Sequence, residues 1–154
     1  MRTWIVASDF SDLSRQARVR AASDLVALGG GRLLFVHIHT PGTGLEGGLD
    51  LSMLGTGADA DRAAMADAEA RLAAEVAALR SNPAYATLDV DMKIEIGRPA
   101  DHVVEVATRE HAERIVVGSH GRRGIERMLL GSVAERIVRL APCAVLVVKE
   151  SAGA

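Results

Sequence analysis

The chain has 154 residues, with 18 basic and 20 acidic side chains and a formal net charge of −2. Its length suits one domain, which we place at residues 1–150, followed by a short tail at residues 151–154. The charge balance lacks the basic excess of nucleic-acid-binding domains, no apolar run approaches the ~18 residues of a membrane span, and no signal-peptide pattern opens the chain. We therefore expect a cytoplasmic protein without nucleic-acid or membrane partners.

The predicted elements alternate between strands and helices along the chain. In order, they are strand Thr3–Ser8, helix Asp12–Leu28, strand Arg32–His39, helix Ala58–Arg80, strand Leu88–Ile96, helix Pro99–His111, strand Glu113–Val117, helix Ser132–Leu140 and strand Cys143–Val148. This alternation predicts right-handed crossovers, and hence an open, doubly wound, Rossmann-like α/β domain. Its five-stranded parallel sheet would carry helices on both faces. Only 3% of the residues are aromatic, so the core must consist mainly of Val, Leu, Ile and Ala.

Several of these bounds carry local signals. Apolar residues recur at helical spacing in the first helix, and Gly29, Gly30 and Gly31 follow it. That stripe contains Leu13, Ala17, Ala21, Leu25 and Leu28. Pro99 suits a first helical position, where its missing N–H would have no intrahelical partner. The segment Thr40–Gly57 is rich in glycine and poor in charge, so we expect a mobile loop that is a candidate lid.

The composition of two strands predicts where they lie in the sheet. Leu88–Ile96 alternates apolar and charged residues, which suits an edge strand with one solvated face. Cys143–Val148 is apolar on both faces, although the last strand of such a sheet is normally also an edge. Unless the tail or a helix covers it, an apolar edge favours association, so we expect a homodimer formed partly through this strand. We interpret the single cysteine, Cys143, as a core residue rather than a reactive thiol.

A glycine-rich segment follows the fourth strand and leads into the fourth helix. Gly118 and Gly121 carry no side chain, so backbone N–H groups can approach a phosphate closely. Gly131 and Ser132 stand where the helix begins, and its first N–H groups and positive dipole end attract an anion. Ligands of open α/β sheets bind outside the carboxyl ends of the strands. The segment is therefore a candidate phosphate site.

The same residues also have interpretations that need no ligand. Ser132 and Glu135 have the spacing of a capping box, which would close the helix N-terminus by itself. The glycines could serve turns. Arg122 and Arg123 could neutralise phosphate charge, but such residues are more often solvated. The residues alone leave phosphate binding and simple capping equally supported.

Gly118, Gly121, Gly131 and Ser132 follow the pattern Gly, two residues, Gly, nine residues, Gly-Ser. This pattern resembles the nucleotide-binding signature of the universal stress protein family. Four further stretches resemble the same family and extend the likeness over nearly the whole chain. They are VASDFS at 6–11, LFVHI at 34–38, GRP at 97–99 and PCAVLVVK at 142–149.

The resemblance implies an ATP-binding regulatory protein of the stress response, with ATP, alone or with Mg²⁺, lying across the strand ends. AMP or a cyclic nucleotide is the alternative ligand. Asp9 would bind the ribose or the adenine, with Ala7 and Ser8 beside it, and Ile38 and Val117 would contact the base. The ribose and phosphates would be held by Gly118, His120, Gly121, Gly131, Ser132 and Val133, with Arg122 as a further candidate. Ala7 departs from the proline of some nucleotide-binding members.

Other chemistry finds less support in the residues. The chain has no P-loop, and no Gly-x-Gly-x-x-Gly follows the first strand. Asp9 could hold Mg²⁺, but capping a turn explains it equally well. His37 and His39 share a strand face without a suitably spaced third ligand, so we predict no metal site. We assign no catalytic residue; two alternatives remain, a slow ATPase or self-phosphorylating enzyme, and a dimeric interaction protein without nucleotide and with an unidentified protein partner.

Overall fold

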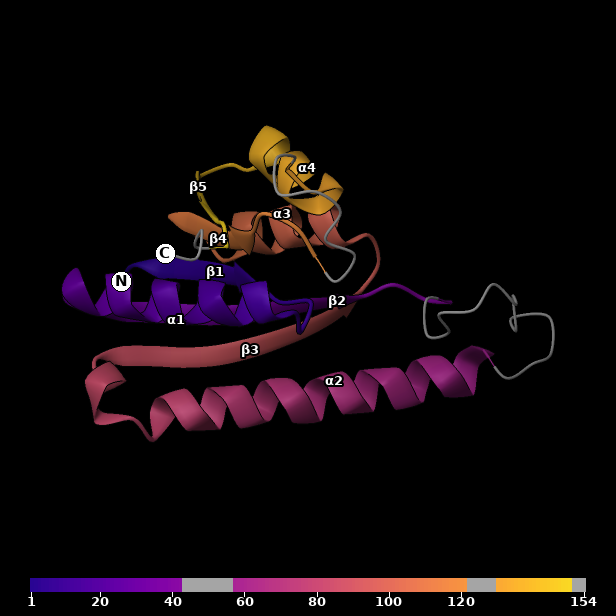
Figure 1. The fold of residues 1–154 in the computed structure, drawn as a ribbon, viewed down its shortest axis with the longest axis horizontal. Coiled ribbons are helices and arrows are strands. Elements are labelled where there is room, and N and C mark those ends of the chain that lie inside the picture. The colour runs from indigo at the N-terminus through magenta and orange to yellow at the C-terminus, as the bar shows by residue number, and fades with distance from the viewer. Residues whose placement is uncertain (43–56, 122–129, 151–154) are drawn as a thin grey trace.

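The computed structural model describes residues 1–42, 57–121 and 130–150. Its helices and strands follow one another as the sequence predicts (Figure 1). They are β1 (Thr3–Ala7), α1 (Asp12–Ala27), β2 (Gly31–His39), α2 (Gly57–Arg80), β3 (Leu88–Ile96), α3 (Pro99–Arg109), β4 (Arg114–Gly118), α4 (Ser132–Leu140) and β5 (Ala144–Val148). A short 3-10 turn, Pro83–Tyr85, joins α2 to β3.

The five strands form a single parallel sheet in the order β3-β2-β1-β4-β5. β1 is central, and its Val6 is paired with Phe35 of β2 on one side and Val116 of β4 on the other. The chain moves outward from β1 through β2 to β3, and then returns to the opposite side for β4 and β5. The sequence prediction of an open, doubly wound α/β sheet is therefore confirmed.

Two apolar layers, one on each face of the sheet, make up the core. On one face, Ile5, Leu34 and Ile115 pack with Val103 and Val106 of α3 and with Ile137 of α4. On the other face, Trp4, Val6 and Phe35 pack with residues of α1 and α2, among them Leu25 and Leu72. Figure 1 shows the same division, with α3 and α4 together on one side and α1 and α2 on the other. Successive residues along each strand point alternately into the two layers, as the pleat of a strand requires.

Some predicted helix ends differ from the observed ones. α1 ends at Ala27, and Leu28 is its C-cap and 47% exposed, so Leu28 does not belong to the buried stripe. α3 ends at Arg109, and His111 lies beyond it with φ of 49° rather than on the helix surface as predicted. The remaining bounds agree with the prediction or differ from it by a single residue, because terminal turns and strand ends lack fixed hydrogen-bond partners.

Both strands predicted at the edges of the sheet lie there. β3 pairs only with β2, and β5 only with β4, within the described part of the chain. In β5, Ala144 is exposed and the four residues after it are half-buried, although helices cover both of its faces. Cys143 precedes the strand and is half-buried against the core, and burial raises the pKa of its thiol above the ordinary value. No helix in the described ranges is long and apolar enough to cross a membrane.

Candidate functional site

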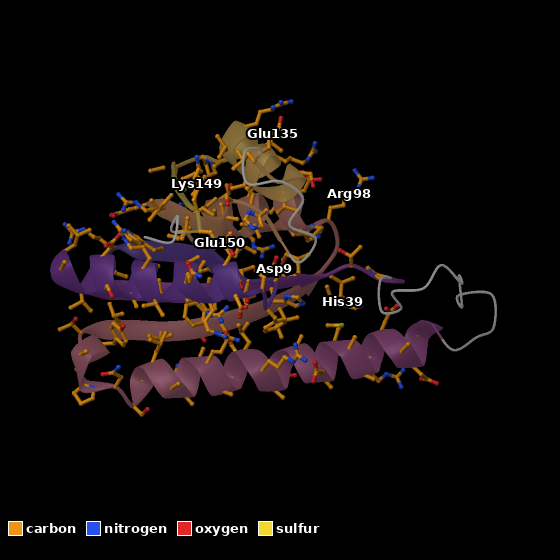
Figure 2. All side chains as sticks on the ribbon, viewed as in Figure 1. Asp9, His39, Arg98, Glu135, Lys149 and Glu150 are labelled. Carbon is orange, nitrogen blue, oxygen red and sulfur yellow. The ribbon has the colours of Figure 1, made fainter. Side chains whose placement is uncertain are left out.

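A cavity of about 480 Å³ lies at the carboxyl ends of β1, β2 and β4. The order of the strands reverses beside β1, so the cavity occupies the topological switch point where open α/β sheets bind ligands. α3 closes one wall with Pro99 and Val103, and the first turn of α4 forms another. Figure 2 shows Asp9 and His39 toward this same end of the sheet.

The cavity brings together eleven of the twelve residues that the sequence analysis proposed for the site. Those lining it are Ala7, Ser8, Asp9, Ile38, Val117, Gly118, His120, Gly121, Gly131, Ser132 and Val133. The twelfth, Arg122, lies outside the described residues, as do Arg123 and most of the segment Thr40–Gly57 proposed as a lid. The structure brings the eleven lining residues together, and their binding of a ligand stays a prediction.

Each of the three described glycines of the signature lies close to a neighbouring chain segment. A Cβ on Gly121 would stand 2.7 Å from Oδ2 of Asp9, and one on Gly131 would stand 3.1 Å from the Ser119 carbonyl oxygen. A Cβ on Gly118 would stand 3.1 Å from Cγ of Leu13. The space is tightest at Gly121, where the lack of a side chain lets the glycine segment approach the loop that carries Asp9.

The N-terminus of α4 faces the cavity without a side-chain cap. Gly131 is the N-cap and has no side chain to cap the helix, and among the described residues no side-chain cap hydrogen bond is made there. The capping box proposed as an alternative is therefore wrong, because Ser132 is already the first helical residue. Glu135 instead accepts a hydrogen bond of 2.9 Å from Nη2 of Arg139. The first N–H groups and positive dipole end of α4 thus remain available to an anion.

Asp9 caps the turn between β1 and α1. Its Oδ1 accepts a hydrogen bond of 2.9 Å from the Ser11 N–H, as the turn-capping interpretation predicts. Phe10, the next residue, has φ of 63°, a left-handed conformation that costs a bulky side chain energy. The Phe10 ring packs 4.7 Å from that of His37 and lies under the Arg71 guanidinium. This contact with β2 and α2 holds the turn in place.

The two histidines of β2 have separate partners. Nδ1 of His37 donates to the Ser8 carbonyl oxygen at 2.8 Å, and His37 also lines the cavity. His39 lies beside α2, where its Nε2 is 3.0 Å from Oδ1 of Asp61. Among the residues that the structure describes, no three potential ligands gather around a metal position.

Several lining residues were not predicted. Ser11 and Ser14 come from the first turn of α1, Pro99 and Val103 from α3, and Leu130 from the end of the glycine segment. Pro99 carried sequence signals as a helix start and as part of the family-like stretch at 97–99, and neither placed it in the site. The connection from β3 places the first turn of α3 over the ends of β1 and β2. This position follows from the order of the strands in the sheet, which the sequence did not predict.

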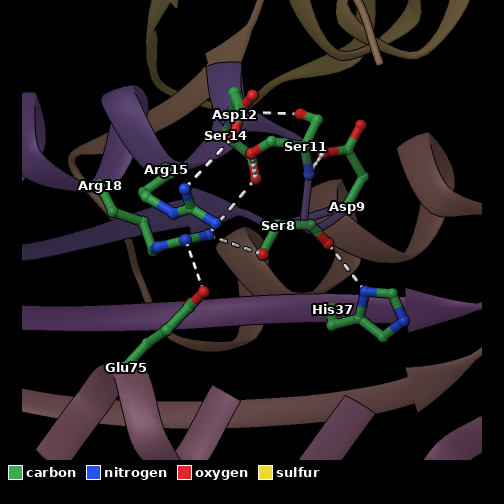
Figure 3. A network of polar contacts seen from close by, with 9 residues as sticks. All are labelled: Ser8, Asp9, Ser11, Asp12, Ser14, Arg15, Arg18, His37 and Glu75. Atoms are coloured by element: carbon green, nitrogen blue, oxygen red, sulfur yellow. Dashed lines mark hydrogen bonds and ion pairs between the residues drawn. The ribbon is translucent and has the colours of Figure 1, made fainter. Parts of the chain in front are cut away.

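A buried polar network lies beneath the cavity (Figure 3). Nη1 of Arg18 donates to Oγ of Ser8 at 3.0 Å and to Oγ of Ser14 at 3.3 Å, and Nη2 donates to Oε1 of Glu75 at 2.6 Å. Burial lowers the pKa of Arg18 and raises that of Glu75, in both cases against the attraction between the two charges. Arg18 and Glu75 therefore lie where burial disfavours their charged forms, directly behind two serines of the cavity wall.

The fold and the cavity together define a small, open α/β domain with a cavity at its topological switch point. A model of the universal stress protein family matches residues 1–149, so the chain belongs to the universal stress protein family. A universal stress protein of Thermus aquaticus is 31% identical over 148 residues, which cover 96% of this chain and 98% of that one. One from Methanocaldococcus jannaschii is 54% identical over 54 residues, 35% of this chain and 32% of that relative's length.

Solved structures of similar proteins extend the likeness to three dimensions. The protein MJ0577 has a TM-score of 0.82 at 20% identity, covering 99% of this chain and 98% of its own, which shows a shared fold. A universal stress protein in complex with cAMP has a TM-score of 0.60 at 26% identity, covering 97% and 98%. A family member from Arabidopsis thaliana with AMP bound has a TM-score of 0.56 at 18% identity, covering 99% and 94%.

Proposed function

We propose that the protein is a cytoplasmic ATP-binding regulator of the stress response, and that its cavity holds the nucleotide. One observation carries the proposal: the N-terminus of α4 and the acidic Asp9 line the same cavity of about 480 Å³. A cavity of this size lies in the range of small-molecule sites. It offers a helix N-terminus for phosphates and a carboxylate that can accept hydrogen bonds from ribose hydroxyls.

The lining gives the nucleotide one favoured direction. The apolar part of the wall combines Ile38, Val103 and Val117 with Pro99, and it suits a flat base. Asp9 would repel phosphates, so they belong at the N-terminus of α4, beside Gly131 and Ser132. Ser132 stands at the first position of that helix and can add a hydroxyl donor.

The comparisons support an adenine nucleotide and leave its phosphate number open. One structural relative is described with cAMP and another with AMP. We favour ATP because the first N–H groups of α4 and the Ser132 hydroxyl together provide several donors for phosphate oxygens. AMP and cAMP are the alternative ligands that the comparisons favour.

We further propose that the protein forms a homodimer through β5. The residues of this strand are apolar, half-buried after Ala144, and at an edge of the sheet within the described chain. Pairing with a second copy would satisfy the edge N–H and carbonyl groups and remove apolar surface from water. Sedimentation of the purified protein at several concentrations measures this directly.

The proposed site is tested by calorimetric titration with ATP, AMP and cAMP, each with and without Mg²⁺. We expect saturable binding that is strongest for ATP, and loss of binding in Gly121→Val, because that side chain enters the space beside Oδ2 of Asp9. Ser132→Ala should weaken binding of ATP more than that of cAMP. Ser81→Ala is the matched control, since Ser81 lies at the end of α2 and donates to Ala78.

The outcomes separate the rival functions. An absence of heat with all three nucleotides, together with no nucleotide in the purified protein, would overturn the proposal and favour a dimeric interaction protein. Release of inorganic phosphate, or a mass increase of about 80 Da per phosphoryl group on the protein, would identify an enzyme instead. Tighter binding of AMP or cAMP would correct the ligand but keep the site.

A further inference from the structure

Arg18 of α1 lies immediately behind the cavity, not in it. Its side chain is 4% exposed, and the guanidinium lies 5.9 Å from the centre of the Phe35 ring. Two residues that line the cavity, Ser8 and Ser14, accept hydrogen bonds from its Nη1. Figure 3 shows the guanidinium between these serines and Glu75 of α2.

The two serine hydroxyls are engaged differently. Oγ of Ser14 accepts from Arg18 and donates to the Ser11 carbonyl oxygen at 3.0 Å, so its proton is directed into the first turn of α1. Oγ of Ser8 also accepts from Arg18. A guanidinium can only donate, so the Ser8 proton must find a different acceptor. Because Ser8 is part of the cavity wall, beside Asp9, that acceptor is available in a bound ligand.

We propose that Arg18 is a positioning residue for the nucleotide site, which fixes the Ser8 hydroxyl and orients its proton toward an acceptor atom of the bound nucleotide. This inference rests on the proposed function. The donor from the guanidinium is charge-assisted, and it polarises the hydroxyl that accepts it, so that the Ser8 proton becomes a stronger donor. The acceptor is a ring nitrogen or a ribose oxygen, because the phosphates lie across the cavity at α4.

Glu75 keeps the guanidinium in this orientation. Its Oε1 accepts from Nη2 at 2.6 Å, which leaves Nη1 to face the two serines. Oε2 of Glu75 is buried, and in the described part of the structure it has no hydrogen-bond partner. Among the described residues, the only hydrogen bond that this carboxylate accepts comes from Arg18. Ser8, Arg18 and Glu75 therefore connect the cavity wall to α2.

A double-mutant cycle on ATP affinity tests the inference. The variants are Ser8→Ala, the paired replacement Arg18→Met with Glu75→Met, and all three together. We expect Ser8→Ala and the paired replacement each to weaken binding by about five- to tenfold, the effect of losing one hydrogen bond between neutral groups. The combination should weaken binding no further, because both changes remove the same donor.

The unfolding free energy, measured on the same samples, separates positioning from stability. If Arg18 has only a structural role, the paired replacement should change stability and leave ATP affinity unchanged. Alternatively, its loss of ATP affinity and that of Ser8→Ala should multiply in the combined variant. Either result overturns the inference. Arg18→Lys, which keeps a cation and one donor, should give intermediate affinity and is the second variant if the paired replacement fails to fold. If the wild-type protein binds no nucleotide, the proposed function fails as well. If it binds ATP but the affinity losses in the cycle multiply independently, only the positioning role is overturned.

Discussion

A negative charge in the first turn of α4 should separate phosphate binding from helix stability. Val133 lines the cavity and is 38% exposed, whereas Val138, on the same helix, is 49% exposed and outside the cavity lining. We therefore compare Val133→Glu with Val138→Glu. An acidic residue near a helix N-terminus stabilises the helix by about 0.3–1 kcal/mol, so Val133→Glu should fold at least as well as its control.

The expected loss of affinity follows from Coulomb's law. A carboxylate about 5 Å from one phosphate charge, at an effective dielectric constant of about 40, raises the free energy of binding by about 1.7 kcal/mol. Kd for ATP without Mg²⁺ should therefore rise by about 20-fold or more in Val133→Glu. Val138→Glu should leave Kd within about twofold.

Titration calorimetry at low and high salt measures the effect. The added penalty in Val133→Glu should shrink at about 1 M salt, where the Debye length falls to about 3 Å. Val133→Gln has nearly the same shape without the charge and should bind close to wild type. Equal Kd values for Val133→Glu and wild type, or equal losses at positions 133 and 138, would refute phosphate binding at this helix.

Three further predictions concern stability and assembly. Glu75→Gln should lower the free energy of unfolding by about 2 kcal/mol in denaturant titrations, because it leaves buried Arg18 without a countercharge, while Glu75 itself retains 26% exposure. A hydrogen bond from Arg32 lowers the pKa of Glu110 below its ordinary value of 4.5. The ionised Glu110 therefore stabilises the fold above pH 4.5, and this contribution is lost as the pH falls through the lowered pKa. Glu110→Gln should flatten the decline of the unfolding free energy in acid by about 1 kcal/mol or less. Ala144→Lys should shift the proposed dimer toward monomer in sedimentation, and an unchanged mass would argue against pairing through β5.

The sequence was informative wherever one element carried its own signal. The alternation of Leu88–Ile96 predicted an edge strand, and the glycine spacing led to four residues that the structure brings to one cavity. The capping box failed because Ser132 and Glu135 fit the pattern equally well one position into the helix, and only the backbone at Gly131 shows where the helix begins. Local pattern cannot resolve such a shift, since caps and first-turn residues share the same composition.

The network behind the cavity could not be predicted in the same way. Arg18 and Glu75 are 57 residues apart and lie on different helices, and each reads alone as a solvated charge. Their contact depends on the chain stepping in one direction from β1 to β2 to β3, because two right-handed crossovers in the same direction place α1 and α2 on the same face of the sheet. Long-range pairs of this kind follow from topology and packing, and no local pattern in the sequence predicts them.

Two of the helices that begin at the cavity, α1 and α4, should respond in opposite ways to the loss of a hydroxyl. Ser11 is the N-cap of α1, and its Oγ accepts a hydrogen bond from the Ser14 N–H at 3.1 Å. Asp9 and Asp12 add negative charge at that end, so α1 is already satisfied and unsuited to phosphate. Ser132 caps nothing in α4. Ser11→Ala should therefore cost about 1 kcal/mol of unfolding free energy and leave ATP affinity nearly unchanged.

Ser132→Ala should do the reverse, weakening ATP binding by about three- to tenfold with the unfolding free energy nearly unchanged. The crossed pattern is the useful result, because each variant serves as the other's control in the same two assays. If both serines affected only stability, the N-terminus of α4 would be an ordinary helix end. If Ser11→Ala weakened binding more than Ser132→Ala, the phosphates would lie at α1, and the direction proposed for the nucleotide would be reversed.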